Sequence, residues 1–223
     1  LIEAYESPSA AKIPDKYKDA DHKWTGVYVG VLGFCSNKTV LKKLGAEAPK
    51  SWDDLLNPAF KGQVSTAHPS TSGTAFTTLW TQNVRLGGQD QALDYMKKLH
   101  SNVLQYTKSG TAPGQIAGRG EVAVGLVFSH DCVKYQEEGM SDLQVSFPKE
   151  GTGYEVGGVA LVAKSKHSEA AKKYIDWAIS ADAQNIGQTV GSYQIPTNPD
   201  AKISDKMVKL DDVTLVDYNF KAA

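Results

Sequence analysis

Several features that would assign this chain to a common functional class are missing from its sequence. No apolar run approaches the roughly 20 residues that a membrane-spanning helix needs. An excess of one charge is also lacking, because 24 Lys and Arg residues stand against 25 Asp and Glu residues. Nucleic-acid-binding domains usually carry a basic face that meets the phosphate backbone. The composition therefore gives no sign of a membrane span and argues against a nucleic-acid partner.

Cysteine residues and common catalytic motifs are equally scarce. The two cysteines, Cys35 and Cys132, belong to no CxxC or Cys/His spacing, so we expect no zinc site. They form either one disulfide or two buried thiols, and both states are open at this point. The GxxxxGK[ST] phosphate loop and the GxSxG nucleophile elbow are absent. We therefore expect no enzymatic activity, no cofactor and no metal ion.

What the sequence does contain is an alternation of strand and helix patterns. Apolar, β-branched runs predict strands at 26–35, 62–67, 121–128 and 154–163. Capping residues and helical spacing predict helices at 51–56, from 69–75 to 85, at 91–100, at 132–139 and at 168–179. In the last of these helices, one apolar face is predicted to hold Ala171, Tyr174, Ile175 and Ala178. The alternation predicts an α/β fold with a largely parallel sheet covered on both faces.

A cluster of hydroxyl side chains lies where the strand at 62–67 gives way to a helix. Four hydroxyls and a glycine occur within five residues: Ser70, Thr71, Ser72, Gly73 and Thr74. A helix N-terminus presents unpaired N–H groups and about half a positive charge, and glycine lets a ligand approach the backbone. The segment therefore predicts an anion site. The alternative is an ordinary N-cap, for which Ser and Thr are the usual residues.

A second polar group, Ser129-His130-Asp131, follows the predicted strand at 121–128. Ligands of open α/β sheets bind beyond the carboxyl ends of strands, and a His beside a carboxylate offers donors and acceptors for sugar hydroxyls. The alternative is a solvated turn in which Asp131 caps the next helix. Glu155, at the start of a strand, and Thr111, in a Ser-Gly-Thr segment before a short helix, are further candidates. Their alternatives are an exposed strand end and a turn.

Longer segments resemble one family in order along nearly the whole chain. They are KWTGVYVGVLGFCSNKTVL, SWDDLLNPAFKGQV, HPSTSGTAFTTL, GRGEVAVGLVFSHD and YEVGGVALVAKSKHSEAAKKYIDWAIS. These segments resemble the type II periplasmic solute-binding proteins of ABC importers, in the cluster of ferric-ion, phosphonate and hexose-phosphate binders. The resemblance implies a periplasmic protein of two α/β lobes, joined by two crossing strands, that close on a ligand. An ABC permease in the inner membrane would then receive that ligand.

The same resemblance implies where the lobes begin and end. Residues 1–33 would form part of lobe one and the first crossing, residues 34–151 lobe two, and residues 152–223 the second crossing and the return to lobe one. Proteins of this kind usually carry a further N-terminal portion of roughly a third of the chain, comparable to a small domain. This sequence starts at Leu1 and lacks that portion, so the first lobe is expected to be incomplete. We expect either self-association through that lobe or a partner chain.

Within this cluster, the strand-end residues favour a sugar phosphate. Iron binders place a Tyr-Tyr pair where this chain has His130-Asp131, and no two tyrosines are adjacent here. Ferric iron prefers hard anionic oxygen donors, which a His-Asp pair supplies poorly. The resemblance to hexose-phosphate binders implies that the 70–74 segment holds the phosphate, while His130, Asp131 and Glu155 hold the sugar hydroxyls. The alternatives are a ferric-ion or phosphonate binder, a small phosphate-ester hydrolase, and a truncated dimeric relative that binds nothing.

Overall fold

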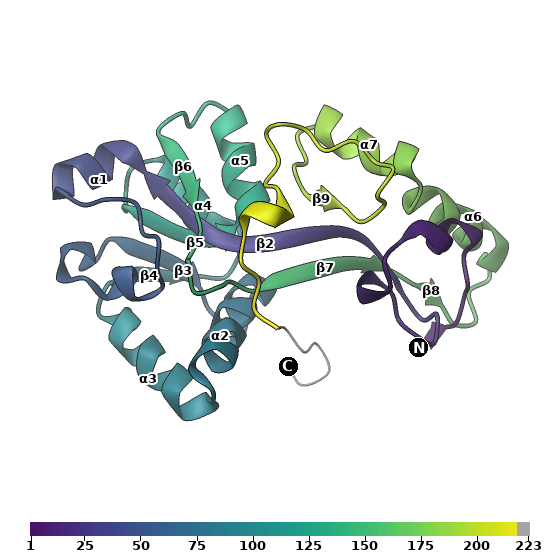
Figure 1. Cartoon of the computed structure of the whole chain (residues 1–223), viewed down its shortest axis with the longest axis horizontal. Helices are drawn as coiled ribbons and strands as arrows, with labels where there is room; N and C mark the ends of the chain where they lie inside the picture. Colours follow the sequence, from purple (N-terminus) through teal and green to yellow (C-terminus); the bar gives the residue numbers. More distant parts are fainter. Residues whose placement is uncertain (218–223) are drawn as a thin grey trace. The chain divides into compact units, whose positions relative to one another are not determined.

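The structure, a computed structural model, describes residues 1–217 of the chain, which divides into two compact units (Figure 1). Unit 1 comprises Leu1–Gly30 and Glu155–Met207, and unit 2 comprises Val31–Tyr154 and the described residues from Val208 onward. The chain passes between the units within β2 (Thr25–Asn37), at the start of β7 (Tyr154–Val159) and after Met207. The lobe boundaries expected at residues 33 and 151 stay a prediction.

Unit 2 is built on a sheet whose strands, apart from β2, share one direction. Its order is β4 (Val103–Thr107), β3 (Val64–Ala67), β5 (Val124–Phe128), β2 and β6 (Leu143–Ser146). β3 pairs in parallel with β4 and β5, whereas β2 pairs antiparallel with β5 and β6. The parallel strands are joined by helical crossovers, as the alternating pattern predicted. β2 reaches the sheet from unit 1 without such a crossover, which leaves it free to run antiparallel.

The crossover helices of unit 2 cover both faces of this sheet. α2 (Gly73–Leu86) and α3 (Gln89–His100) connect β3 to β4, and they pack on each other. α4 (Ala112–Gly118) and α5 (Ser129–Glu137) make connections that run across the sheet in the opposite direction. Because crossovers are right-handed, the two directions place the two helix pairs on opposite faces (Figure 1).

Local sequence signals set the bounds of α2. Its N-cap is Ser72, whose side chain accepts a hydrogen bond from the N–H of Ala75, and it ends at Gly87, which adopts φ of 80°. Glycine is favoured at such a left-handed helix end because it has no Cβ. The strand pattern did not predict β4 or β6. The three central residues of β4 are exposed, so this edge strand lacks the apolar run by which buried strands are found.

Two apolar clusters form the core of unit 2. One surrounds Phe34 and Trp52, whose rings meet edge to face with centroids 5.0 Å apart. The other surrounds Cys35 and Cys132, which form a disulfide between β2 and α5 with their Cα atoms 5.6 Å apart. The structure thus selects the disulfide from the two states that the sequence left open. The remaining elements of unit 2 are α1 (Lys38–Leu44) and the 3₁₀ turns Asp53–Leu56, Pro58–Phe60 and Leu210–Asp212.

Unit 1 has short strands and two helices. β1 (Ile2–Glu3) pairs with β8 (Leu161–Val162), and β9 (Ile195–Pro196) and β7 both pair with β2. The helices are α6 (Ser168–Ala178) and α7 (Ala181–Thr189), and two 3₁₀ turns lie at Pro8–Lys12 and Asp15–Tyr17. Among residues 1–217, no helix combines the length and the apolar character that crossing a bilayer requires.

The prediction for the apolar face of α6 was wrong at one residue. Ile175 and Ala178 are buried, but the side chain of Tyr174 is 59% exposed although it was expected on the same face. Successive residues of an α-helix are rotated by about 100° about its axis, so Tyr174 and Ile175 point in different directions. Ile175 points into unit 1, which leaves Tyr174 on the surface.

Candidate functional site

Three parallel strands of unit 2 end side by side, and each is followed by a loop and a helix. The pairing sets Ala67 of β3 opposite Thr107 of β4, and Ser65 of β3 opposite Gly125 of β5. α2 follows β3, α4 follows β4 and α5 follows β5. Because the carboxyl ends of neighbouring parallel strands lie at one edge of a sheet, the N-termini of these helices gather there. The structure therefore brings the 70–74 segment, Thr111 and the His130-Asp131 pair to the same edge.

The hydroxyl segment combines helix capping with open space. Ser72 is the N-cap that the alternative interpretation predicted, and Thr71 Oγ1 donates hydrogen bonds to the carbonyls of His68 and Lys108, both at 3.2 Å. Ser70 Oγ lies 2.7 Å from His68 Nδ1. At Gly73, an added Cβ would meet nothing within 4 Å. The space beside Gly73 leaves room for a ligand at the start of α2, where the first N–H groups have no acceptor within the helix and Ser72 accepts only that of Ala75.

Gly110 lies in the loop before α4, and its backbone packs against the first turn of α2. A Cβ added to Gly110 would collide with the hydroxyls of Thr74 and Ser72. Only glycine lets the two segments approach this closely. The sequence analysis selected Thr111 and not Gly110, although Gly110 lies in the same Ser-Gly-Thr segment. Thr111 is exposed, and its side-chain hydroxyl lies 2.9 Å from Ser109 Oγ.

His130 and Asp131 lie in the first turn of α5 and are nearly covered. Their side chains are 11% and 15% exposed, and His130 Nε2 is 3.9 Å from Asp131 Oδ1. The His130 ring stacks on Phe128 with the centroids 5.7 Å apart. Asp131 is not the N-cap of α5, because Phe128 occupies that position. The turn interpretation of Asp131 was therefore wrong in its capping role.

Burial changes the proton affinity of both side chains. It lowers the pKa of His130 to about 4. It raises the pKa of Asp131 to about 6, an effect that the positive charge of Lys134 partly opposes. At pH 7 the imidazole is therefore neutral and the carboxylate is charged. A buried carboxylate is costly unless hydrogen-bond donors reach it, and ligand hydroxyl groups supply such donors.

Three contacts hold α5 in place, and the sequence analysis offered only one of them, the disulfide, as one of two states. Cys132, which follows Asp131 in the chain, is bonded to Cys35 of β2. Tyr135 donates a hydrogen bond from its hydroxyl to the carbonyl of Thr111 at 3.2 Å. The ring of Tyr135 packs against the backbone of Gly114 in α4. These contacts connect α5, α4 and the loop before α4 into one packed edge.

Glu155 lies in unit 1, where it is the second residue of β7 and half-buried. The hydroxyl of Tyr28 donates a hydrogen bond to Glu155 Oε1 at 3.2 Å. Tyr28 lies in β2 and packs over Gly157, where any Cβ would clash with its ring. The sequence analysis missed Tyr28 because it read the apolar β2 run only as a strand. The hydroxyl group of Tyr28, a hydrogen-bonding group within an apolar run, was the signal that could have identified this residue.

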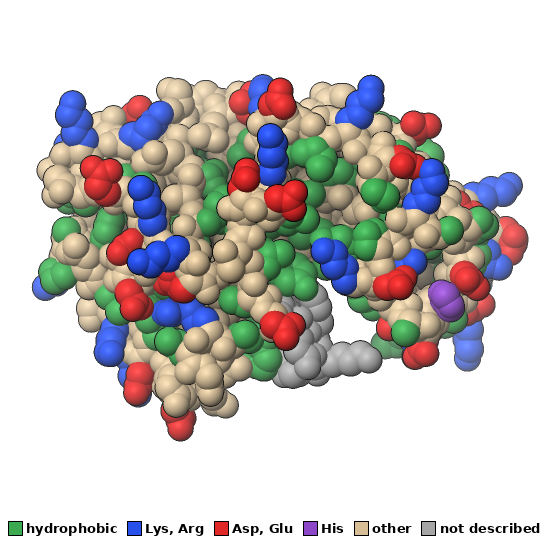
Figure 2. Space-filling model, viewed as in Figure 1, with side chains coloured by type: hydrophobic (Ala, Val, Ile, Leu, Met, Phe, Trp, Pro, Cys, Tyr) green, Lys and Arg blue, Asp and Glu red, His purple; other side chains and the backbone are tan. Residues whose placement is uncertain are grey.

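Charges of both signs are mixed on the face that Figure 2 shows, and the described residues include no candidate metal centre. Figure 2 shows acidic and basic side chains interspersed over the face in view. Within residues 1–217, no group of three or more His, Cys, Asp or Glu side chains is placed to hold a metal ion. The polar groups that gather at the sheet edge are therefore helix N-termini, hydroxyls and the His130-Asp131 pair.

Comparisons with known proteins find relatives over nearly the whole chain. The model of the bacterial extracellular solute-binding protein family matches residues 1–222. An uncharacterized protein of Haemophilus influenzae is 39% identical over 99% of this chain and 65% of its own length. The Fe(3+)-binding periplasmic protein of Serratia marcescens is 24% identical over 96% of this chain and 63% of its own. The chain thus spans less than two thirds of these curated relatives.

A solved structure gives the same result at the level of the fold. The periplasmic binding protein AfuA from Actinobacillus pleuropneumoniae, with exogenous fructose-6-phosphate bound, matches with a TM-score of 0.91. It is 41% identical, and the match covers 99% of this chain and 70% of AfuA. The α/β fold of the chain is accordingly that of the type II periplasmic binding proteins.

Proposed function

The chain belongs to the family of bacterial extracellular solute-binding proteins, and from this membership we propose that it captures a small phosphorylated solute for an ABC importer. Its relatives include periplasmic binding proteins, and the periplasm is its location. A hexose phosphate is the ligand class that its residues support best. The solute is held by hydrogen bonds, no covalent bond changes, and an ABC permease of the inner membrane receives it.

One observation carries the proposal: the N-termini of α2, α4 and α5, the last of which holds the His130-Asp131 pair, lie at one edge of the unit 2 sheet. Aligned peptide dipoles give each helix start a partial positive charge, and the free N–H groups point outward. A phosphate group therefore gains charge-assisted hydrogen bonds without a lysine or arginine. In this proposal Ser70, Thr71, Ser72, Gly73 and Thr74 hold the phosphate, with Thr111 as an additional donor.

The sugar would be recognised by groups of the opposite polarity. Asp131 accepts hydrogen bonds from hydroxyl groups, and neutral His130 offers one donor and one acceptor. Glu155, oriented by Tyr28, is proposed to accept further hydroxyl hydrogen bonds. This division would account for the hydroxyl-rich start of α2 and the buried carboxylate of Asp131 after adjacent strands. AfuA, whose solved structure contains fructose-6-phosphate, agrees with this ligand class.

A ferric-ion binder is the second candidate, because the Serratia marcescens relative carries that function in its name. Its identity of 24% is well below that of AfuA. His130 and Asp131 provide one carboxylate and one imidazole, whereas ferric iron prefers several anionic oxygen ligands. The donor set therefore favours the phosphorylated solute.

Isothermal titration calorimetry tests the proposal with four ligands: fructose-6-phosphate, glucose-6-phosphate, free fructose and inorganic phosphate. We expect a hexose phosphate to bind at least about tenfold more tightly than either free fructose or inorganic phosphate, which corresponds to about 1.4 kcal/mol. The proposal is wrong if neither hexose phosphate binds. Titration with ferric citrate and an absorbance scan tests the iron candidate, since a ferric site with oxygen ligands is coloured.

A further inference from the structure

His68, the residue directly after β3, accepts both hydrogen-bond donors of Ser70. The backbone N–H of Ser70 donates to His68 Nδ1 at 3.2 Å, and Ser70 Oγ lies 2.7 Å from the same nitrogen. A backbone N–H group can only donate, so Nδ1 is the acceptor and carries no proton. The Ser70 hydroxyl therefore also donates to Nδ1, and the single ring proton of a neutral His68 is on Nε2.

This hydrogen bonding leaves Ser70 without a donor for a ligand. A fully ionised phosphate group accepts hydrogen bonds, whereas the Ser70 hydroxyl presents only lone pairs while its proton points to Nδ1. Ser72 differs, because its hydroxyl accepts a hydrogen bond from the N–H of Ala75, which does not use its own proton. In the phosphate site that we propose, the contribution of Ser70 therefore depends on the state of His68.

Protonation of His68 reverses the direction of the hydrogen bond to Ser70. A protonated Nδ1 is a donor, so Ser70 Oγ becomes its acceptor and the hydroxyl proton is free to point to a ligand. The backbone N–H of Ser70 loses its acceptor and is released as well. The imidazolium also adds a positive charge beside the start of α2. All three changes favour the binding of an anion.

An aromatic row connects His68 to β4 and α3. The exposed ring of His68 meets the ring of Tyr106 in β4 edge to face, with the centroids 6.0 Å apart. Tyr106 stacks on His100, the last residue of α3, with the centroids 5.7 Å apart. Burial raises the pKa of Tyr106, so its hydroxyl stays protonated at neutral pH. His100 is the second titratable histidine of the row, and Nδ1 of its ring lies 3.0 Å from the Tyr106 hydroxyl.

The other elements around His68 provide no negative charge for it. β3 has no charged residue, and the first turn of α2 has no acidic one. Lys108, which follows β4 and whose carbonyl accepts a hydrogen bond from Thr71, adds a positive charge. Within residues 1–217, His68 forms no ion pair with a carboxylate. A positive charge on His68 would therefore be compensated by a bound anion and not by an ion pair within the chain.

We infer that His68 is a positioning residue of the proposed phosphate site: its neutral ring holds the donors of Ser70, and its protonated ring releases them to a phosphate group. The inference rests on the proposed function, because the ligand is the phosphorylated solute. Linked equilibria are reciprocal, so ligand binding and protonation of His68 strengthen each other by the same factor. The chain should therefore take up part of a proton at His68 when it binds a hexose phosphate.

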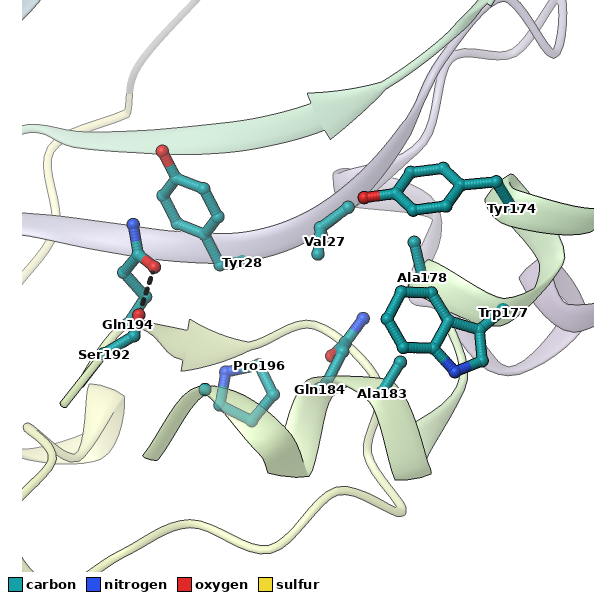
Figure 3. A pocket seen from close by; sticks show the side chains of 11 residues that line it. Val27, Tyr28, Tyr174, Trp177, Ala178, Ala183, Gln184, Ser192, Gln194 and Pro196 are labelled. Atoms are coloured by element: carbon teal, nitrogen blue, oxygen red, sulfur yellow. Dashed lines mark hydrogen bonds between the residues drawn. The ribbon is translucent and has the colours of Figure 1, made fainter. Parts of the chain in front are cut away.

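A ligand in the pocket of unit 1 would not produce this proton uptake. Figure 3 shows that pocket, where the side chains of Val27, Tyr174 and Trp177 gather and the Ser192 hydroxyl donates to the amide oxygen of Gln194. Its volume is about 190 Å³, and none of the residues that line it is a His, Asp or Glu. Proton uptake near pH 7 thus distinguishes binding at the proposed site from binding in this pocket.

Nitrogen NMR of the histidine rings tests the hydrogen bonding of His68 without any ligand. At pH 8 histidine side chains are ordinarily neutral, and the ¹⁵N shifts show which ring nitrogen carries the proton. We expect the proton of His68 on Nε2, and His68→Gln identifies its signals by their loss. In Ser70→Ala, Nδ1 should lose one of its two donors, and its resonance should move toward that of a free, unprotonated ring nitrogen. A proton on Nδ1 at this pH would overturn the inference.

Calorimetry in two buffers that differ in ionisation enthalpy measures the protons taken up on binding. The hexose phosphate that binds more tightly is titrated at pH 7 into the unchanged chain and into His68→Gln. Gln can accept the hydrogen bonds of Ser70 with its carbonyl oxygen but cannot gain a charge. We expect the unchanged chain to take up more protons per bound ligand than His68→Gln. The ligand and Asp131 titrate in both chains, so their contributions cancel in the comparison.

The affinity should show the same coupling. His68→Gln should weaken binding about tenfold at pH 6 and less than about twofold at pH 8, in the range of one charge-assisted hydrogen bond. Introducing Ser70→Ala into both chains should reduce this pH-dependent difference, because no hydroxyl remains to be released. His100→Gln is the matched control. It removes a histidine of the same aromatic row that contacts Tyr106, and it should leave proton uptake and affinity unchanged.

Two further results would overturn the inference. One is equal proton uptake by the unchanged chain and His68→Gln, and the other is a loss of affinity that is the same at pH 6 and pH 8, which indicates a structural role. Circular dichroism establishes that the variants are folded, and His68→Asn replaces His68→Gln if the latter is not. Failure of both hexose phosphates to bind would overturn the proposed function together with the coupling. Binding without proton uptake at His68 would overturn the coupling alone.

Discussion

The backbone of Gly110 lies directly against the hydroxyl group of Thr74, so the loop before α4 and the first turn of α2 are in contact. This relationship sets the spacing of two helix N-termini that we propose for phosphate binding. Gly110→Ala should therefore destabilise the chain by about 1–3 kcal/mol, the usual cost of overpacking. Urea unfolding measures the change. Gly73→Ala is the control, because an added Cβ meets nothing within 4 Å there, and its stability should be unchanged or slightly higher.

The second prediction concerns the hydroxyls of α2. The double substitution Ser72→Ala with Thr74→Ala should weaken hexose-phosphate binding by about 1–3 kcal/mol for each charge-assisted hydrogen bond lost. Calorimetry gives the affinity. Ser72→Ala also removes an N-cap, which costs about 0.5–2 kcal/mol of stability.

A matched control separates the ligand contact from this capping effect. Ser180 caps α7 in unit 1, where its side chain accepts a hydrogen bond from Ala183. Ser180→Ala should lower stability to a similar extent and leave affinity unchanged. Equal affinities of the double variant and the unchanged chain would remove the 70–74 segment from the site.

The third prediction is the pH dependence of sugar recognition. Burial raises the pKa of Asp131 to about 6, so the carboxylate that accepts sugar hydroxyls is lost as pH falls below that value. The affinity for hexose phosphate should decrease from pH 7 to pH 5. The phosphate ester also titrates near pH 6, so the pH dependence of the affinity is compared with that of Asp131→Asn, which has no carboxylate. The difference between the two profiles reports the titration of Asp131.

Asp131→Asn should also distinguish the two parts of the ligand. We expect the affinity for fructose-6-phosphate to fall by about tenfold or more, the range expected for a hydrogen bond to a charged group. The affinity for inorganic phosphate should stay the same. An equal loss for both ligands would assign Asp131 to the phosphate, or to the structure of α5, and not to the sugar.

The fourth prediction concerns stability and His130. Its pKa is about 4 in the folded chain and 6.5 in its ordinary state, so between these values the unfolded chain binds more protons. The free energy of unfolding should therefore fall as pH decreases from 6.5 to 4, by on the order of 3 kcal/mol from this group. Asp131 acts in the opposite direction, because its raised pKa makes the folded chain bind more protons between 3.8 and about 6.

The two effects can be separated in variants. Asp131→Asn removes the titration of Asp131. The double variant Asp131→Asn with His130→Gln also removes the titration of His130. Urea unfolding at several pH values should show a steeper acid decline for Asp131→Asn alone than for the double variant. Parallel profiles would show that the His130 imidazole is not buried in its neutral form.

The fifth prediction concerns the disulfide between Cys35 and Cys132, which are 97 residues apart in the sequence. Reduction should lower the free energy of unfolding by about 2–4 kcal/mol, since the bond closes a long loop. Cys132 follows Asp131, so reduction should also weaken hexose-phosphate binding through movement of α5. The chain has no other cysteines, and Cys35→Ala with Cys132→Ala should reproduce the effect of the reductant. The double variant should then be insensitive to reductant.

Much of the local structure could be predicted because its signals are local. Ser72 caps α2 and Gly87 ends it, and both are residue types that helix ends favour, so a helix from the 69–75 segment to residue 85 could be predicted. β5 and α5 follow from a buried apolar run and a polar segment directly after it. The family resemblance also came from contiguous segments, and the match over residues 1–222 confirms it.

The sequence by itself thus determined many of the elements, though not β4 or β6, and it determined the family and the residues worth testing, since capping, periodicity and motifs act over a few residues. Only the tertiary structure decided that Cys35 pairs with Cys132, that Gly110 touches Thr74 and that Tyr28 meets Glu155. It also decided that Tyr174 is exposed while Ile175 is buried. Each of these depends on which distant segment packs opposite a residue. Hydrophobic burial favours contact between apolar residues but does not specify which residues meet. The order of the strands and the packing of the helices determine those pairs.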